Sequence, residues 1–243
     1  MTVMGDEHID KIRIKAEPEP IGIDFSKTAI LVVDMQNAFV SEGGYFDAMG
    51  YDLSETQKIL PPCRKIIGAG RARGIKIIYL QMGWSRDLSD KGPQESPVVY
   101  KSRVPSLLTQ RPDLKDKLYI YGTWGAEIIE ELKPQAGDII VKKQRYDGFI
   151  GTNLDLILRT LEMKYLIFTG TATNVCVEST LRHAFFLDYF PILVSDAVSQ
   201  KGPDIAQKAA ILNVQSTFGW VTTSNNLLHA MDYMNKPTRS HHH

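Results

Sequence analysis

Apolar and β-branched residues recur along the chain in six short runs, with amphipathic segments between most of them. The clearest run, TAILVVDM at 28–35, is apolar at almost every position and ends near a carboxylate. This pattern is typical of a strand that is buried on both faces of a sheet. We predict strands at 28–35, 75–82, 137–143, 165–170, 189–196 and 218–223, of which the last has the weakest pattern.

Segments with helical periodicity lie between most of these runs. The predicted helices cover residues 64–74, 125–133, 152–163, 174–188 and 204–217. Strands and helices that alternate in this way form a parallel sheet with helices on both faces. The predicted fold class is therefore α/β: a three-layer α/β/α sandwich with a six-stranded parallel sheet, of the Rossmann-like kind. Ligands of such sheets bind beyond the carboxyl ends of the strands.

The length of 243 residues suits one well-packed domain, which we place at residues 26–236. Residues 1–25 contain prolines and lack periodicity, so we expect an N-terminal arm that can lie on a neighbouring subunit. Residues 239–243 end in three histidines and have the composition of a purification-tag remnant. The connection from Gly83 to Pro105 is unusually long, and we expect it to cover a site.

Charge and cysteine content narrow the classes of partner. The 28 basic and 28 acidic residues balance, so electrostatics favours neither nucleic acid nor an anionic membrane surface. No stretch approaches the roughly 20 apolar residues of a membrane span. The two cysteines, Cys63 and Cys176, lie far apart and form no CxxC motif or disulfide pattern. We therefore expect a cytoplasmic protein with a small-molecule ligand.

Three predicted strand ends carry reactive side chains: Asp34, Lys143 and Cys176. Because the carboxyl ends of parallel strands share one edge of the sheet, we expect these groups to meet. The helix dipole and a nearby lysine favour a thiolate, so we expect a lowered pKa for Cys176. Asp34 would accept the thiol proton and later return it to a leaving amine.

Simpler structural roles exist for the same residues. A lone cysteine at the start of a helix can be an inert core residue, Asp34 can cap the following helix, and Lys143 can pair with a surface carboxylate. His183 is a poor candidate for the base, since it lies seven residues beyond Cys176, or about 10 Å along the same helix.

A glycine-rich stretch, GAGRARG at 68–74, superficially resembles a dinucleotide-binding fingerprint. That fingerprint follows a strand and opens a helix, whereas this stretch ends a predicted helix and precedes a strand. We therefore interpret Gly74 as a helix C-cap and expect no nucleotide site here.

Three motifs in order closely resemble those of the cysteine hydrolases of the isochorismatase-like superfamily: AILVVDMQNAF (29–39), VKKQRYDGF (141–149) and FTGTATNVCVESTLRHAFFLDY (168–189). The resemblance extends from about Asp24 to Leu228, and within the superfamily it is strongest to the ureidoacrylate amidohydrolases of the Rut pyrimidine-degradation pathway. It implies a catalytic triad of Asp34, Lys143 and Cys176, in which Cys176 is the nucleophile and forms a thioester.

The resemblance also implies an oxyanion hole. In the family, a cis peptide before the cysteine directs backbone amides at the substrate carbonyl. Here that peptide would join Thr171 and Ala172, and the amides of Ala172 and Cys176 would form the hole. Some relatives, the nicotinamidases, bind a metal through a D-x-H pattern after the second strand, but residues 81–90 contain no histidine. We therefore expect neither a metal nor another cofactor.

The activity that the resemblance implies is hydrolysis of a C–N bond in a small linear ureido or carbamoyl compound, with release of ammonia or carbamate. We expect aromatic residues to enclose a planar substrate and polar residues to orient it. The predicted substrate contacts are Phe39, Asn37, Gln81, Met82, Trp84, Lys101, Ser102, Arg145, Tyr146, Phe149 and Thr171. The ureidoacrylate enzymes carry an asparagine in place of Met82, which keeps triuret and biuret as alternative substrates.

A second class of function stays open at this point, a non-catalytic binding module on the same fold. The presence of Asp34, Lys143 and Cys176 together favours an enzyme over such a module. The resemblance further predicts a homodimer or homotetramer.

Overall fold

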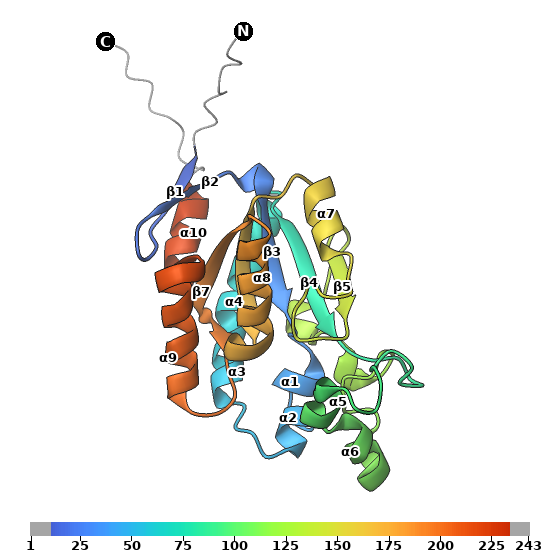
Figure 1. Ribbon diagram of the computed structural model, residues 1–243. Helices are drawn as coiled ribbons and strands as arrows, with labels where there is room; N and C mark the ends of the chain where they lie inside the picture. Colours follow the sequence, from blue (N-terminus) through green and yellow to red (C-terminus); the bar gives the residue numbers. More distant parts are fainter. Residues whose placement is uncertain (1–10, 234–243) are drawn as a thin grey trace, which may run out of the picture.

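The computed structural model describes residues 11–233 and is built on a sheet of six parallel strands (Figure 1). The strand order is β5-β4-β3-β6-β7-β8, so the chain begins in the middle of the sheet and extends it first to one side and then to the other. The strands are β3 (Thr28–Val33), β4 (Lys76–Met82), β5 (Ile139–Lys143), β6 (Tyr165–Thr171), β7 (Phe190–Ser199) and β8 (Trp220–Thr222). All six predicted strands are confirmed.

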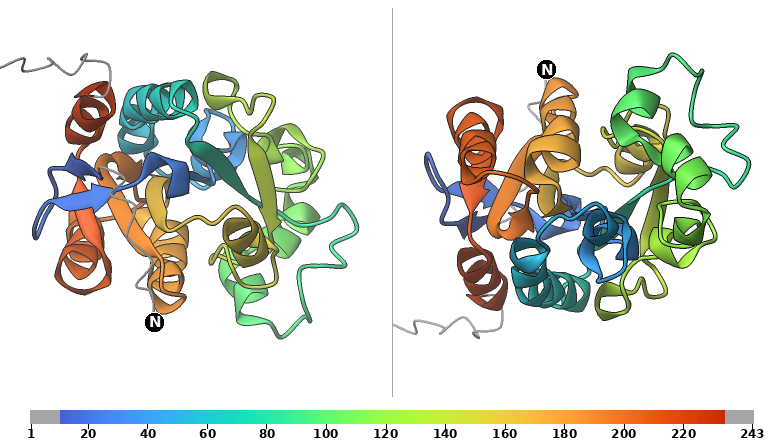
Figure 2. Two further views of the ribbon diagram at one scale, coloured as in Figure 1. Left: turned by 90° about the horizontal axis from the view of Figure 1, so that it is seen from above. Right: turned by 90° about the horizontal axis from the view of Figure 1, so that it is seen from below.

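Helices cover both faces of the sheet, which confirms the three-layer sandwich (Figure 2). One face carries α4 (Leu60–Ala72) and α10 (Ser224–Tyr233). The other face carries α7 (Leu154–Thr160), α8 (Glu178–Phe186) and α9 (Asp204–Asn213), and α9 continues into the π-helical turn η6 (Val214–Phe218).

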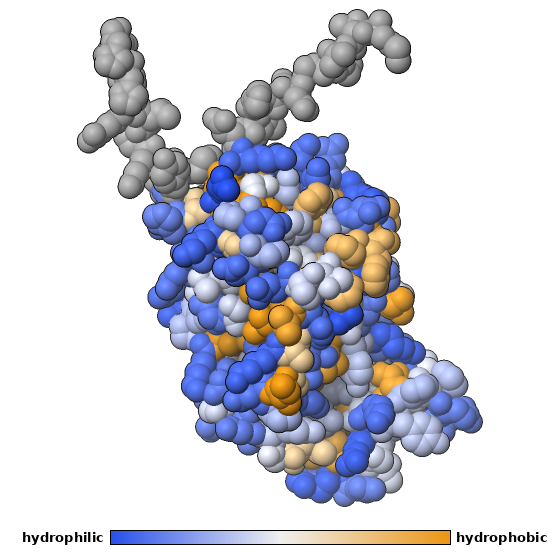
Figure 3. Space-filling view, turned by 60° about the vertical axis from the view of Figure 1, so that its left-hand side comes forward, coloured by the Kyte–Doolittle hydropathy of each residue, from blue (hydrophilic) through white to orange (hydrophobic). Residues whose placement is uncertain are grey.

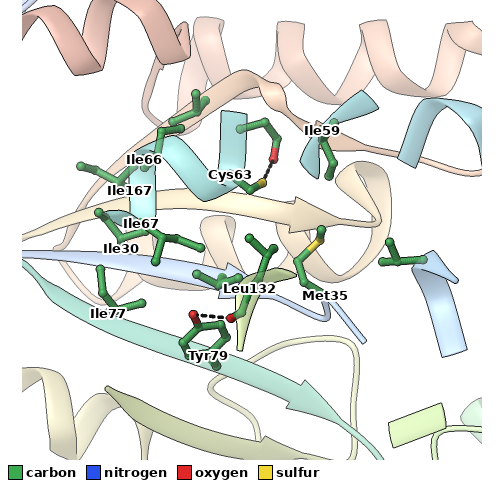
Figure 4. Packing of buried hydrophobic residues seen from close by; sticks show 14 of the residues in the cluster. Ile30, Met35, Ile59, Cys63, Ile66, Ile67, Ile77, Tyr79, Leu132 and Ile167 are labelled. Atoms are coloured by element: carbon green, nitrogen blue, oxygen red, sulfur yellow. Dashed lines mark hydrogen bonds between the residues drawn. The ribbon is translucent and has the colours of Figure 1, made fainter. Parts of the chain in front are cut away.

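The central strand β3 explains the two layers of core. Its side chains alternate between the faces, so Leu31 and Val33 join one apolar cluster while Ile30 and Val32 join the other. All six of its residues are buried. Ile30 packs with Ile66 and Ile67 of α4, as Figure 4 shows for this side of the sheet. The continuous apolar run at 28–33 is therefore required by burial on both faces.

One predicted helix is wrong. Residues 125–133 form two short 3₁₀ turns, η3 (Trp124–Ala126) and η4 (Glu130–Leu132). The buried side chains of this segment are Ala126, Ile129 and Leu132, at a spacing of three residues. That spacing suits 3₁₀ geometry, with three residues per turn, better than an α-helix. Elsewhere, α4 ends as predicted, with Gly74 at a φ of 69° just beyond its C-cap.

The structure describes residues 11–25 of the predicted N-terminal arm. Residues 11–25 form an antiparallel hairpin of β1 (Ile12–Ile14) and β2 (Ile21–Ile23), which packs on the same chain through the fully buried Ile14 and Ile23. Glu17 between the strands pairs with Val221 of β8. Residues 1–10, the end of the predicted domain at 234–236 and the predicted tag remnant at 239–243 lie outside the described residues.

Short helices gather beyond the carboxyl ends of the strands (Figure 1). The long connection after Gly83 contains α5 (Pro97–Ser102) and the beginning of α6 (Val104–Gln110). The remaining short helices are α1 (Asn37–Val40), α2 (Tyr45–Ala48), α3 (Ser54–Lys58) and η2 (Pro112–Leu114). The turn η1 (Phe25–Lys27) instead directly precedes β3, at the amino end of that strand.

The surface is mainly hydrophilic, with small groups of apolar side chains (Figure 3). Among the most exposed large apolar residues are Phe186 of α8 and Ile205 and Leu212 of α9, which are 67%, 68% and 61% exposed. Among the helices that the structure describes, none combines the length and apolar character needed to cross a membrane.

Close contact between β6 and β3 depends on Gly170. This glycine has a φ of 110°, and a Cβ atom added to it would lie 2.1 Å from the carbonyl oxygen of Val33. Only a residue without a side chain allows the two central strands to pair at this point. Gly170 thereby fixes where β6 ends and the following turn begins.

We expect Gly170→Ala to lower the free energy of unfolding by more than about 3 kcal/mol, since it adds a backbone clash to an unfavourable φ. Gly151→Ala is the matched control, because Gly151 has a φ of 70° but open space around its Cα. The control should lose only about 1–2 kcal/mol. Urea unfolding of both variants measures the difference, and equal losses would contradict the steric role of Gly170.

Candidate active site

A buried ion pair joins the ends of two strands that are not neighbours. Asp34 follows β3 directly, and Lys143 is the last residue of β5. The Lys143 ammonium donates to the Asp34 carboxylate at 2.8 Å, and the two side chains are 0% and 2% exposed. The ammonium also donates to the carbonyls of Arg145 and Tyr146, both at 3.2 Å. All three donor hydrogens of Lys143 therefore have an acceptor.

The Asp34 carboxylate also accepts a hydrogen bond from β4, the strand between β3 and β5. The amide of Met82, at the end of β4, donates to Asp34 Oδ1 at 3.1 Å and to the side-chain oxygen of Gln36 at 2.8 Å. Gln36 in turn donates to the carbonyls of Met82 and Ala126. Asp34 has a φ of 51° and does not cap a helix, since α1 begins at Asn37. The capping alternative for Asp34 is thus wrong.

Cys176 lies beyond β6 in a π-helical turn, η5 (Thr173–Val177), which runs directly into α8. Single π-turns within helices are frequent at functional sites. The hydroxyl of Thr180 donates to the Cys176 carbonyl at 2.6 Å and accepts from the amide of Gly148 at 2.9 Å. Thr180 therefore ties the helix that carries the thiol to the segment after β5 that carries Lys143.

Burial sets the protonation of the three groups. It raises the pKa of Asp34, against the opposing effect of Lys143. Burial alone would lower the pKa of Lys143, but the charge of Asp34 and the nearby Cys176 outweigh it and raise that pKa. Burial, and then the Asp34 carboxylate, raise the pKa of the Cys176 thiol, while Lys143 lowers it. Burial, the largest of these effects, therefore opposes the lowered thiol pKa that the sequence analysis expected.

The peptide bond between Thr171 and Ala172 is cis, at the position that the sequence motif predicted. This peptide connects the end of β6 to η5, so Ala172 directly precedes the turn and Cys176 lies within it.

A cavity of about 260 Å³ opens beside the thiol. Nine predicted site residues line it, and they come from five different segments of the chain: Asp34, Phe39, Met82, Lys101, Ser102, Tyr146, Thr171, Ala172 and Cys176. Both residues of the predicted oxyanion hole, Ala172 and Cys176, are among them. The placement of Lys101 and Ser102 on α5 means that the long connection after Gly83 does reach the site, as expected.

Five predicted substrate contacts lie elsewhere: Asn37, Gln81, Trp84, Arg145 and Phe149. Strand alternation explains Gln81, since its neighbour Met82 faces the cavity and the Gln81 amide instead donates to Ala126. The amide of Asn37 donates to Trp124, and the fully buried Trp84 donates to Gln144.

The other two of these residues, Arg145 and Phe149, also make contacts away from the cavity. The Arg145 guanidinium donates to the carbonyl of Gln144. Phe149 packs against His183 and Tyr189. His183 itself lies 2.5 Å from Asp147, away from the cavity, so it has no place beside the thiol.

Five lining residues were missed by the sequence analysis: Tyr45, Phe46, Tyr119, Val175 and Lys201. Tyr45 and Phe46 belong to α2, and Lys201 precedes α9. They lie in loops and short helices, where periodicity gives no signal about direction. Within residues 11–233, no three His, Cys, Asp or Glu side chains gather as a metal-binding group.

Comparison with known proteins finds a matching protein family and similar sequences over most of the chain. The model of the isochorismatase domain matches residues 28–226. The ureidoacrylate amidohydrolase RutB of Yersinia enterocolitica serotype O:8 is 48% identical over 209 residues, which cover 86% of this chain and 91% of the relative. RutB of Rhizobium rhizogenes is 45% identical over 219 residues, covering 90% and 89%.

Solved structures agree with these relatives. A cysteine hydrolase from Pseudomonas syringae pv. phaseolicola 1448A superposes with a TM-score of 0.71 at 30% identity, covering 87% of this chain and 95% of that one. The N-carbamoylsarcosine amidase of Thermoplasma acidophilum superposes with a TM-score of 0.62 at 28% identity, covering 82% and 97%.

We expect Lys143→Met to lower the free energy of unfolding by about 3–5 kcal/mol, because it leaves the Asp34 carboxylate buried without a counterion. Lys142→Met is the control, since Lys142 lies on the same strand but is exposed and contacts only the face of Tyr121. It should change stability by no more than about 1 kcal/mol. Urea unfolding at neutral pH distinguishes them, and similar losses in both variants would mean that the pair contributes nothing specific.

Proposed function

This chain belongs to the isochorismatase family, and we propose that it is a cysteine-dependent amidohydrolase. Its substrate would be a small linear ureido or carbamoyl compound, such as ureidoacrylate, from which it releases ammonia or carbamate through a thioester intermediate. One observation carries the proposal: Asp34 and Cys176 line the same cavity, and Lys143 completes a buried charged group with Asp34. The names of the relatives support the substrate class.

The first half of the proposed reaction forms the thioester. Asp34 accepts the proton of the Cys176 thiol, and the resulting thiolate attacks the carbamoyl carbon. The amides of Ala172 and Cys176 stabilise the negative charge that develops on the carbonyl oxygen. Asp34 then returns the proton to the departing nitrogen, so the C–N bond breaks as the amine leaves. Lys143 keeps its ammonium next to Asp34 throughout and balances its charge.

The second half restores the enzyme. Water takes the place of the departed amine, Asp34 accepts one of its protons, and the hydroxide attacks the thioester carbonyl. The C–S bond breaks and Asp34 returns the proton to the sulfur. The product is a carbamate when the group bound to the sulfur is a carbamoyl group. One carboxylate thus serves as base and as acid in both halves.

Two alternatives have weaker support. Triuret or biuret would also present a carbamoyl carbon to the thiol, but the relatives with 45% and 48% identity carry the name of ureidoacrylate hydrolases. A non-catalytic binding module would have no use for a carboxylate and an ammonium buried beside a thiol, which cost free energy to bury.

We also propose that the chain assembles as a homodimer or homotetramer. The exposed apolar side chains Phe186, Ile205 and Leu212 supply surface that association would cover. The expected result of size-exclusion chromatography with light scattering is a mass of two or four chains at micromolar concentration. A mass of one chain across the concentration range would refute the assembly.

We expect Cys176→Ser to lower turnover of ureidoacrylate by at least about a thousandfold. A serine hydroxyl is much less acidic than a thiol, so Asp34 would not deprotonate it effectively and it would be a poor nucleophile. Cys63→Ser is the matched control, since Cys63 is fully buried against Ala197 and away from the cavity. Release of ammonia is measured for ureidoacrylate, triuret, biuret, N-carbamoyl amino acids and nicotinamide. Retention of substantial activity in Cys176→Ser would refute the mechanism, and turnover of none of the compounds by the unaltered protein would refute the proposed substrate class.

A further inference from the structure

The charges around the cavity are strongly one-sided. Asp34 is the one acidic side chain that lines it within residues 11–233, and that carboxylate is already paired with Lys143. Two further lysines, Lys101 and Lys201, also line the cavity. In the part of the chain that the structure describes, neither of them forms an ion pair or a hydrogen bond. The walls of the cavity therefore carry two positive charges that no protein group described here balances by an ion pair or hydrogen bond.

Lys201 is held in place without a counterion. Its ammonium lies 4.5 Å from the ring centre of Phe46 and 4.6 Å from that of Tyr51. Two aromatic faces attract a cation but leave its N–H donors free to meet another acceptor. The half-buried position makes an ion pair with a ligand stronger than it would be in open water.

Lys101 comes from another segment of the chain and is exposed. It lies in the last turn of α5, on the long connection after Gly83, whereas Lys201 follows β7. Its neighbour Ser102 also lines the cavity, and the Ser102 carbonyl accepts from the hydroxyl of Tyr45. This bond ties α5 to α2, which also carries Phe46, so the segments that hold the two lysines are joined through one short helix.

We propose that Lys101 and Lys201 bind a carboxylate at the far end of the substrate, so that the enzyme selects anionic ureido acids over neutral ureas such as biuret and triuret. This inference rests on the proposed function and assigns Lys201 as a specificity-determining residue. A carboxylate can pair with both ammonium groups, whereas a neutral urea leaves the half-buried Lys201 and the exposed Lys101 without a counterion.

The arrangement also fixes the direction in which the substrate binds. The charges of Asp34 and Lys143 balance each other, so the thiol end of the cavity offers no unpaired cation to a carboxylate. The acid end is therefore directed to the lysines, and the carbamoyl end to Cys176. A neutral urea has two similar ends and no such preference.

The test compares Lys201→Met with the matched control Lys208→Met, which removes the same charge from an exposed position on α9. The substrates are ureidoacrylate and its methyl ester, which differ in the charge of the acid end. We expect Lys201→Met to lower kcat/KM for the acid at least about tenfold, mainly through KM. The ester should change by less than about twofold, Lys201→Arg should restore most of the loss, and Lys208→Met should leave both substrates unaffected.

An equal loss for acid and ester, or no loss for either, overturns the proposal. So does a preference of the unaltered enzyme for biuret or triuret over ureidoacrylate. A calorimetric titration with ureidoacrylate tests the site without turnover, by comparing Cys176→Ser with the double variant Cys176→Ser/Lys201→Met. If the two bind ureidoacrylate with equal affinity, the carboxylate site is refuted even where the hydrolase function stands. If Lys201→Met weakens binding but the unaltered enzyme hydrolyses none of the compounds, the site stands and the proposed function fails.

Discussion

The ion pair between Lys143 and Asp34 is the interaction on which the site depends. Each charge costs several kcal/mol to bury, so the pair persists only with good geometry and full hydrogen bonding. Both conditions come from the sheet. Neighbouring strands lie about 4.8 Å apart, so β3 and β5 are separated by about 10 Å across β4. A lysine is long enough to cross the end of β4 and meet the aspartate, while the amide of Met82 in β4 donates to the carboxylate.

The same burial explains why the thiol needs Asp34. A cysteine at a helix start gains from the dipole, but burial and the adjacent carboxylate raise the pKa of Cys176. In the proposed reaction, the thiol therefore has to lose its proton to a base before the sulfur can attack. In the proposed reaction Asp34 receives it, and burial also raises the pKa of that carboxyl, which makes the carboxylate a stronger base than it would be in water. The nearby ammonium keeps the site close to neutral whichever of the two holds the proton.

Much of the fold and of the reactive group could be predicted from the sequence, since both follow from strand periodicity. A run buried on both faces predicts a central parallel strand, and the residue after it lies at the ligand-binding edge, as Asp34 does. The cis peptide at Thr171 was predicted from the motif alone. The cavity walls were harder to predict, because side-chain direction decides them. Gln81 and Met82 are adjacent but face opposite ways, and Phe46 and Lys201 lie in connections that carry no period.

The cavity combines two environments that a ureido acid would need. At the thiol, the paired charges of Asp34 and Lys143 cancel, which suits a neutral carbamoyl group about to acquire charge on its oxygen. Elsewhere on the cavity wall, Lys101 and Lys201 leave an excess of positive charge. Binding energy from the remote carboxylate can then position the reacting carbon without placing a negative charge beside the base. A neutral substrate would forgo that contribution, so the charge distribution argues for an acid as the compound that this site evolved to hold.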